Sequence, residues 1–340
     1  MNTGSTLINR KYLPIVVTVS LFVLMYGIAS VMYPDFLSFR VFYNLLIDNS
    51  YLGIIAIGET FVILTGGIDL SVASVIAMTT MISAVLLEHA HWSPILVIPI
   101  ALAAGSALGF VMGCLIHFFK MPPFITTLAG LYFSRGICFI MSINSIPITN
   151  KFYTQVAQTR IHLVGGFVSI NVVIFAVVTI LAIVLAHYTK FGRVVYAIGG
   201  NEQSALLMGL PVGRTKVLVY TLSGFCSALA GVVFTFYILS GYGLHVDGMV
   251  LSAIAATVIG GTLLTGGVGY VFGTVFGTLI LGTINAIIVF QGTLSSWWTK
   301  IATGALMFVF ILFQALLSAR EGKPKRSAAS EESEMAMTRS

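Results

Sequence analysis

The sequence predicts an all-α, polytopic inner-membrane protein, a bundle of about ten transmembrane helices. Of its 340 residues, 58% are hydrophobic and only 8% are charged. So few charges do not suffice to cover a water-soluble globule. The apolar runs extend unbroken for about 20 residues, the length of a helix that crosses a bilayer, and lack the short alternating pattern of a β-barrel. Helices are then the way to satisfy the backbone groups in lipid.

Turn residues such as Tyr33-Pro34-Asp35 and Pro122-Pro123 separate the apolar runs. The first run follows Arg10 and Lys11 and is longer than a signal-peptide core, so we interpret it as an uncleaved span. Residues 1–318 form the predicted transmembrane domain, and the polar tail 319–340 is predicted to be disordered. The predicted spans are residues 13–33, 44–65, 70–87, 94–117, 124–142, 168–188, 215–238, 250–265, 270–290 and 299–318.

The distribution of Lys and Arg predicts the orientation. With the N-terminus inside, inner segments contain twelve of these residues and outer segments four, while Arg135 lies within a span. This asymmetry follows the positive-inside rule. An even number of spans then places both termini in the cytoplasm. The net charge of +6 is explained by these loops, so no nucleic-acid partner is predicted.

An internal repeat relates two parts of the chain. Residues 64–68 (Leu-Thr-Gly-Gly-Ile) match residues 264–268 (Leu-Thr-Gly-Gly-Val), each at the end of an apolar run. Transporters are often built from such repeats, with the pathway at the repeat interface. The pattern predicts two related halves, and the alternative is chance recurrence in a glycine-rich chain.

Two glycine series at four-residue spacing predict close helix packing, because they let another backbone approach. Gly267-Val268-Gly269 followed by Gly273 resembles a dinucleotide fingerprint, but no soluble βαβ unit surrounds it, so that interpretation is rejected. The series are Gly105, Gly109 and Gly113, and Gly269, Gly273 and Gly277.

The sequence contains no Walker motif, no Ser/His/Asp arrangement and no zinc signature. The cysteines Cys114, Cys138 and Cys226 lie in apolar runs and suit packing. We therefore predict a chain that is not an enzyme and that binds neither metal nor cofactor.

Ionisable residues within predicted spans are costly, so each is a functional candidate. Glu59 and Arg135 are expected to pair, to hydrogen-bond a polyhydroxylated solute, or to be structural charges satisfied by neighbouring helices. Asp48 lies on the same span as Glu59. Asp69 precedes Leu70-Ser71, as a helix N-cap does, so a cap and a pathway role both stay open.

The inner segment 189–216 predicts a docking element. Asn201 suits the cap of a short helix with Glu202 in its first turn, and Gly209 suits its end. The predicted apolar side includes Ala205, Leu206, Met208 and Leu210. This side suits a cleft in a motor protein, and the alternative is a helix that rests on lipid. The predicted coupling residues are Asn201, Glu202, Ala205, Met208 and Gly209.

Three ordered motifs resemble the sugar ABC-importer permeases of the ribose/xylose/galactose branch. They are residues 66–71 (Gly-Gly-Ile-Asp-Leu-Ser), 196–202 (Tyr-Ala-Ile-Gly-Gly-Asn-Glu) and 259–269 (Ile-Gly-Gly-Thr, then Thr-Gly-Gly-Val-Gly). The resemblance covers residues 13–317. Residues 292–301 are particularly similar to permeases of galactofuranose importers.

The resemblance implies a dimer with a second permease copy or a related chain. It also implies a cytoplasmic ATPase partner that carries ATP and Mg, a periplasmic sugar-binding protein, and a coupling helix at residues 201–210. Two departures stand out. Ala73 replaces a frequent glycine, and Glu59 replaces an uncharged residue, so no family role transfers to Glu59.

The expected function is inward transport of a monosaccharide by alternating access. The rivals are an ABC permease for an amino acid and an ion-coupled secondary transporter, while nothing favours a structural scaffold. Sugars are uncharged, so hydroxyl and amide side chains are the natural pathway partners. The predicted pathway residues are Glu59, Thr60, Thr65, Asp69, Thr127, Arg135, Thr262 and Asn285.

Overall fold

A computed structural model describes residues 13–293, 295 and 297–321. Within this part of the chain, eight helices are long and apolar enough to cross a membrane, and two further apolar helices are shorter. The all-α polytopic class with about ten helices is confirmed. The helices are α1 (Leu13–Met32), α2 (Phe39–Leu64), α3 (Val72–Ala84) with a π turn at Val85–His89, α4 (Pro94–Phe118), α5 (Pro123–Met141), α6 (Lys151–Gln158), α7 (Ile170–Tyr188), α8 (Lys190–Gly200), α9 (Glu202–Leu207), α10 (Val212–Ile238), α11 (Met249–Ile259), α12 (Val271–Gln291) and α13 (Trp297–Glu321).

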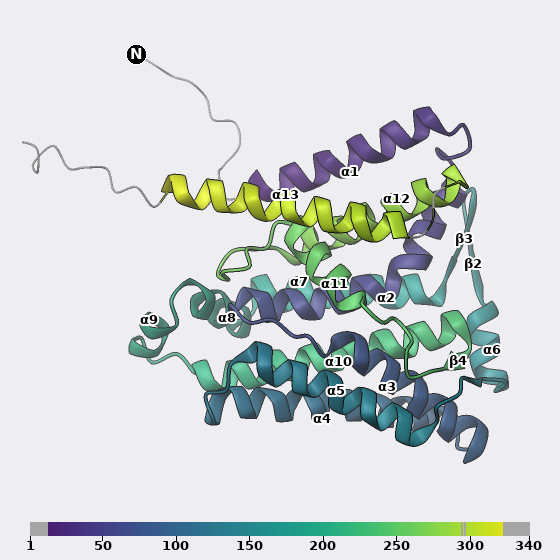
Figure 1. Cartoon of the computed structure of the whole chain (residues 1–340), viewed down its shortest axis with the longest axis horizontal. Helices are drawn as coiled ribbons and strands as arrows, with labels where there is room; N and C mark the ends of the chain where they lie inside the picture. The colour runs from purple at the N-terminus through teal and green to yellow at the C-terminus, as the bar shows by residue number, and fades with distance from the viewer. Residues whose placement is uncertain (1–12, 294, 296, 322–340) are drawn as a thin grey trace, which may run out of the picture.

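The long helices run roughly along one axis of the molecule (Figure 1). Most residues of α2, α3, α10 and α12 are buried, whereas only a minority of the residues of α1, α4, α5 and α7 are, as expected of helices that face lipid. The short helix α9 lies at one end of the bundle, together with the start of α1 and the end of α13 (Figure 1). We call this the α9 end, and the other the opposite end.

The predicted span 250–265 is wrong in its second half. Helix α11 ends at Ile259, and residues 260–270 form a loop before α12. Gly261, Gly266 and Gly267 have φ values of +89°, +85° and +76°. These left-handed conformations suit glycine and cannot continue a right-handed helix. Hydropathy alone did not reveal the break because the loop is itself apolar.

The opposite end carries structure that the sequence did not predict. Strands β2 (Arg160–Leu163) and β3 (Gly166–Ser169) form an antiparallel hairpin whose turn contains Gly165 at φ +80°. Strands β1 (Ile146–Pro147) and β4 (Ser240–Gly241) tie the connection after α5 to the one after α10. The predicted outer loop 143–167 is therefore mostly ordered.

Most of the tail predicted from residue 319 onward lies outside the described residues. So do Arg10 and Lys11 before the first span.

Candidate functional site

The two copies of the repeat meet inside the bundle. The loop after α2, residues 65–71, lies against the loop after α11, because the Gly267 N–H donates to the Leu64 carbonyl at 2.9 Å. Gly66 at φ +79° and Gly266 at φ +85° make equivalent left-handed turns. The hydroxyls of Thr60 and Thr274 lie 2.8 Å apart on the adjoining helices. The two matching strings therefore lie in contact, and we call this contact the loop junction.

Helix α8 ends on the loop junction. A Cβ on Gly199 would collide with the Leu64 carbonyl oxygen and with the Gly267 amide nitrogen. The Tyr196 hydroxyl donates to the carbonyl of Gly269 at 2.7 Å, just beyond the junction. The helix that precedes α9 therefore touches both halves of the repeat, backbone against backbone.

A buried carboxylate cluster lies beside the junction. Glu59 and Asp69 are both fully buried. Glu59 Oε1 accepts a hydrogen bond from the Asp69 N–H at 3.1 Å, while Glu59 Oε2 has no partner among the described residues. Asp69 Oδ2 accepts from the Ser223 hydroxyl on α10 at 2.7 Å. These bonds connect α2, the loop after it and α10.

Asp69 also supports the start of α3, although it is not the N-cap. Ser71 occupies the N-cap position, and Asp69 Oδ1 accepts from its N–H at 2.9 Å and its hydroxyl at 2.6 Å. The carboxylate thus accepts hydrogen bonds at the start of α3, where the turn offers no backbone acceptor. The sequence placed the N-cap at Asp69, two residues before the N-cap that the structure shows at Ser71.

None of the predicted threonines is among the residues that line the two cavities found within the described part of the chain. Thr65 donates to the Val62 carbonyl at 2.8 Å, and Thr127 donates to the Pro123 carbonyl at 2.9 Å, both within one helical turn. Thr60 donates to the Ala56 carbonyl at 2.7 Å. Thr262 is buried, and its hydroxyl has no partner among the described residues. Thr60, Thr127 and Thr262 thus belong to the packed interior, and Thr65 is half-buried, in the conformation observed.

Arg135 does not pair with Glu59. Its guanidinium donates to the Gly243 carbonyl at 2.6 Å and to Asp247 Oδ1 at 2.9 Å. Both acceptors lie on the loop between β4 and α11, so the pair links α5 to that loop. We call it the Arg135–Asp247 clasp. No sequence pattern points to Asp247 as the partner, because it lies 112 residues away and outside the predicted spans.

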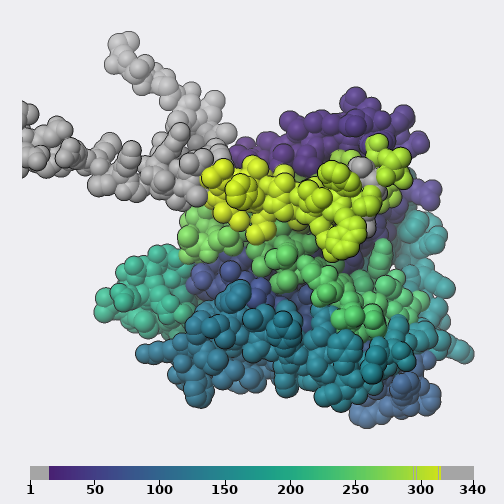
Figure 2. All heavy atoms as spheres, viewed as in Figure 1, coloured from purple at the N-terminus to yellow at the C-terminus, as the bar shows by residue number. Residues whose placement is uncertain are grey.

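Helix α9 is held rigidly where the sequence predicted a docking element. The Asn201 side chain accepts from the Ser204 N–H at 2.8 Å, which caps the helix. Glu202 accepts two hydrogen bonds of 2.7 Å from Lys216 Nζ on α10. Gly209 at φ +72° ends the segment. In Figure 2 the α8–α9 segment projects from its end of the molecule as a separate lobe.

The exposed apolar side of α9 differs from the predicted one. Ala205 is fully buried and packs with Val194, Ile198 and Val212, so it anchors α9 rather than presenting a docking surface. Leu206, Leu207 and Met208 are the exposed side chains, and Leu207 is 89% exposed. The prediction omitted Leu207.

The first glycine series lies where α4 crosses α10. A Cβ on Gly105, Gly109 or Gly113 would press on the backbone of Gly224, Tyr220 or Val217 of α10, respectively. Such contacts leave no room for a side chain between the helices.

The second glycine series is split. Gly269 lies in the loop before α12, so it is not part of a helical stripe. Gly273 and Gly277 lie on α12, and a Cβ on either would collide with the carbonyl of Gly260 or Ala256.

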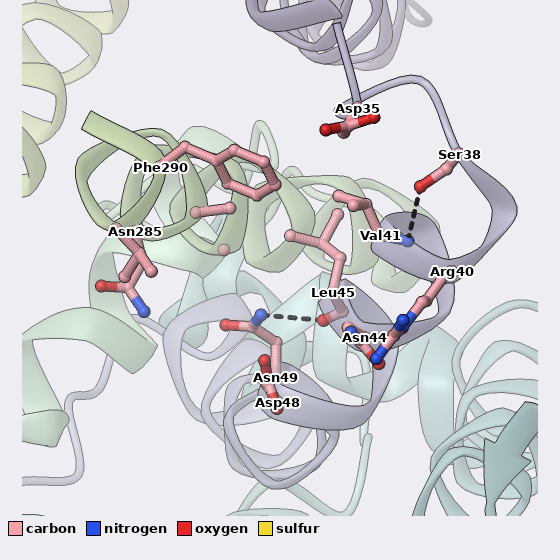
Figure 3. A pocket seen from close by; sticks show the side chains of 13 residues that line it. Asp35, Ser38, Arg40, Val41, Asn44, Leu45, Asp48, Asn49, Asn285 and Phe290 are labelled. Carbon is pink, nitrogen blue, oxygen red and sulfur yellow. Dashed lines mark hydrogen bonds between the residues drawn. The ribbon is translucent and has the colours of Figure 1, made fainter. Parts of the chain in front are cut away.

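A cavity of about 630 Å³ with both polar and apolar walls lies at the opposite end, between α2 and α12 (Figure 3). Asn285 projects from α12, and Asn44, Asp48 and Asn49 project from α2. Asn285 is thus the one predicted pathway residue that this cavity brings to its wall. Sequence reasoning noted Asp48 as a costly ionisable residue but missed its neighbours on the same helix.

The comparisons with known proteins identify the family. The family described as "Branched-chain amino acid transport system / permease component" matches residues 41–311. The inner membrane ABC transporter permease protein YjfF of Escherichia coli is 49% identical over 90% of this chain and 92% of its own length. The chain belongs to this permease family. It is a transport subunit of an ABC system.

Other relatives have names that refer to sugars. The fructose import permease protein FruG of Bifidobacterium longum is 35% identical over 94% of this chain and 95% of its own length. The ribose import permease protein RbsC of Bacillus subtilis is 38% identical over 86% of this chain and 90% of its own length. No solved structure matches the chain at a significant level.

Proposed function

We propose that the chain is the membrane permease of an ATP-driven importer that moves a monosaccharide inward across a bacterial inner membrane. The observation that supports this most directly is the contact of α8 with both halves of the loop junction at Gly199. An importer of this class needs a path from the ATPase to the membrane helices. The relatives named for ribose and fructose import support a sugar as the solute.

The mechanism is alternating access driven through α9. The exposed Leu206, Leu207 and Met208 form a compact apolar surface that suits a cleft in a cytoplasmic ATPase. The Glu202–Lys216 ion pair and the buried Ala205 fix α9 to the bundle. A displacement of α9 is then passed through α8 to both loops of the junction. The two halves change arrangement together, as a two-state transporter requires.

The ATP chemistry belongs to the partner. ATP and Mg²⁺ are bound by the ATPase, and the permease supplies docking and reorientation. The other proposed partners are a periplasmic sugar-binding protein and a second permease, either a copy of this chain or a related one. With both termini in the cytoplasm, α9 faces the ATPase and the opposite end faces the binding protein.

The identity of the sugar is a more specific proposal. The similarity of residues 292–301 to galactofuranose permeases favours a galactofuranose-like monosaccharide. The family description, which names branched-chain amino acids, favours an amino acid as the second candidate.

Uptake into proteoliposomes that contain the complete importer tests both candidates. We expect ATP-dependent uptake of a radiolabelled sugar and none of leucine. Uptake by the permease alone, driven by an ion gradient, would show a secondary transporter. Leucine uptake driven by ATP would support the amino-acid candidate.

A further inference from the structure

The cavity between α2 and α12 has features that the proposed mechanism does not use. It lies at the opposite end from α9, where Tyr33, just after α1, and Gln291, at the end of α12, form a side-chain hydrogen bond. Its volume of about 630 Å³ lies within the range of small-molecule sites, about 300–1,000 Å³. The cavity is therefore large enough for a monosaccharide.

The polar groups of the cavity lie well inside the candidate membrane-spanning helices α2 and α12. Asp48 is nine residues from the start of α2, which is about 14 Å along a helix, and Asn285 is six residues from the end of α12, about 9 Å. Polar side chains at such depth are costly in contact with lipid. Asn44, Asp48 and Asn285 are nevertheless exposed, and they face this cavity. A polar occupant explains their presence.

Much of their hydrogen-bonding capacity is unused. Asp48 Oδ1 accepts from the Tyr237 hydroxyl at 3.1 Å, and Oδ2 has no partner among the described residues. Asn49 donates once, to the Leu45 carbonyl at 2.8 Å. The side chains of Asn44 and Arg40 make no hydrogen bond or ion pair within the described part of the chain. Several donors and acceptors therefore remain for a ligand (Figure 3).

The chemistry of the cavity fits a sugar. An amide offers both donors and an acceptor, as a sugar hydroxyl does, and three asparagines line the cavity. The Phe290 ring and the Val289 side chain supply apolar wall for the carbon-bound hydrogens of the sugar ring. Arg40 is outnumbered by Asp35 and Asp48, so the site is formally anionic and does not suit an anionic lipid headgroup.

We propose that this cavity is a monosaccharide-binding vestibule, in which Asn44, Asp48, Asn49 and Asn285 hydrogen-bond the solute. The proposal rests on the proposed sugar-import function and assigns it an entry site. The vestibule receives the sugar at the end remote from the ATPase. Because Asp48 bonds Tyr237 on α10, an occupied vestibule contacts the central helix as well.

A protection experiment tests the vestibule on the complete importer in lipid nanodiscs, where both membrane faces are accessible. Val289→Cys places a thiol on the apolar wall, away from the polar contacts. A water-soluble maleimide labels it while D-ribose, D-fructose, L-arabinose or D-galactose is added at millimolar concentration. We expect at least one sugar to slow labelling several-fold. The control Asn144→Cys, on an exposed loop, should label at the same rate with and without sugar.

Two variants sharpen the assignment. Asp48→Asn keeps the shape of the side chain, and Asn285→Ala removes an amide. In the Val289→Cys background, each should raise the sugar concentration needed for half-protection about fivefold to tenfold, the effect of one lost hydrogen bond to a neutral solute. The transport KM should rise similarly, while the maximal rate stays nearly constant.

The results distinguish a failure of the vestibule proposal from a failure of the import proposal. Intact ATP-driven sugar uptake without protection at Val289→Cys by the transported sugar would overturn the vestibule and leave the import function standing. Protection by leucine and by none of the sugars would show an amino-acid site and overturn the assignment. If no sugar is taken up, the import proposal fails, whereas protection by sugar would still support the cavity as a sugar site.

Discussion

At the α9 end of the bundle backbone packs directly on backbone, whereas at the opposite end side chains surround a polar cavity. Gly199 contacts the Leu64 carbonyl and the Gly267 amide with no side chain between them. Around the cavity, by contrast, α2 and α12 are separated by asparagine and aspartate side chains. The same pair of helices meets through the Thr60 and Thr274 hydroxyls nearer the α9 end.

This difference affects how a displacement of one helix is transmitted to its neighbours. A backbone contact has no side-chain rotamers that absorb a displacement, so a shift of α8 at Gly199 must move the loops it touches. Around the cavity, side chains change rotamer at little cost and adapt to a solute. The α9 end is thus suited to transmission, and the opposite end to recognition.

The largest expected effect is at Gly199. In Gly199→Ala the new Cβ collides with two backbone atoms, and overpacking of this kind costs about 1–3 kcal/mol or more. We expect a lower thermal midpoint of the purified importer and loss of uptake. Gly200→Ala is the matched control, because a Cβ there meets nothing within 4 Å. If the two variants have the same thermal midpoint and the same uptake, the backbone contact at Gly199 does not transmit a displacement of α8.

The next effect concerns the helix crossings near the same end. Gly109→Leu and Gly273→Leu place a branched side chain against the Tyr220 and Gly260 carbonyls. Both variants should assemble poorly, as monitored by size-exclusion chromatography in detergent. Gly136→Leu on α5 is the control, since a Cβ there meets nothing within 4 Å. Normal assembly and uptake of the first two variants would contradict close packing at these positions.

The docking surface of α9 predicts loss of function without loss of folding. Leu207→Glu places a charge at the most exposed apolar position of α9. Membrane abundance and thermal midpoint should stay unchanged, while uptake and the stimulation of ATP hydrolysis are lost. Val164→Glu, at an exposed apolar position in the β2–β3 turn, is the control and should transport normally. If Leu207→Glu still couples transport to ATP, α9 is an ordinary surface helix.

The sequence predicted some of these features and not others, for physical reasons. Long apolar runs and positive-inside charges depend on local composition, so the helices and the α9 segment were found within a few residues. The end of α11 was missed, because a left-handed glycine turn has the same hydropathy as a helix. The inward orientation of Ala205 was missed, since α9 has fewer than two turns and its facing depends on α8 and α10.

Pairings across the fold were harder still. Glu59 and Arg135 were both noted as costly charges, but the partner of Arg135 comes from a loop whose path depends on the β1–β4 pairing. The cavity was missed as a site because Asn44 and Asn285 lie 241 residues apart in sequence. The repeat pointed to both loops of the junction, although the contact between them could not be read from the sequence.

The smallest effect is expected at the Arg135–Asp247 clasp. The Asp247 side chain is 74% exposed, and such ion pairs contribute about 0.2–1 kcal/mol. Asp247→Asn should therefore lower the thermal midpoint only slightly. Arg135→Gln should cost more, because the Gly243 carbonyl loses its donor as well. A double-mutant cycle with both substitutions isolates the coupling of the two charges.

The small energy of the Arg135–Asp247 clasp helps to hold a strained loop in place. Val246 adopts φ +51°, a left-handed conformation that is costly for a β-branched residue, so neighbouring contacts must hold the loop in place. Burial lowers the pKa of His245 in the same loop, which favours its neutral imidazole, and Asp247 is the charged residue that pairs with Arg135. We therefore expect Arg135→Gln to raise the proteolytic sensitivity of residues 239–248 while the α9 end stays protected. Equal sensitivity at both ends would contradict the division between a transmitting and an adaptable end.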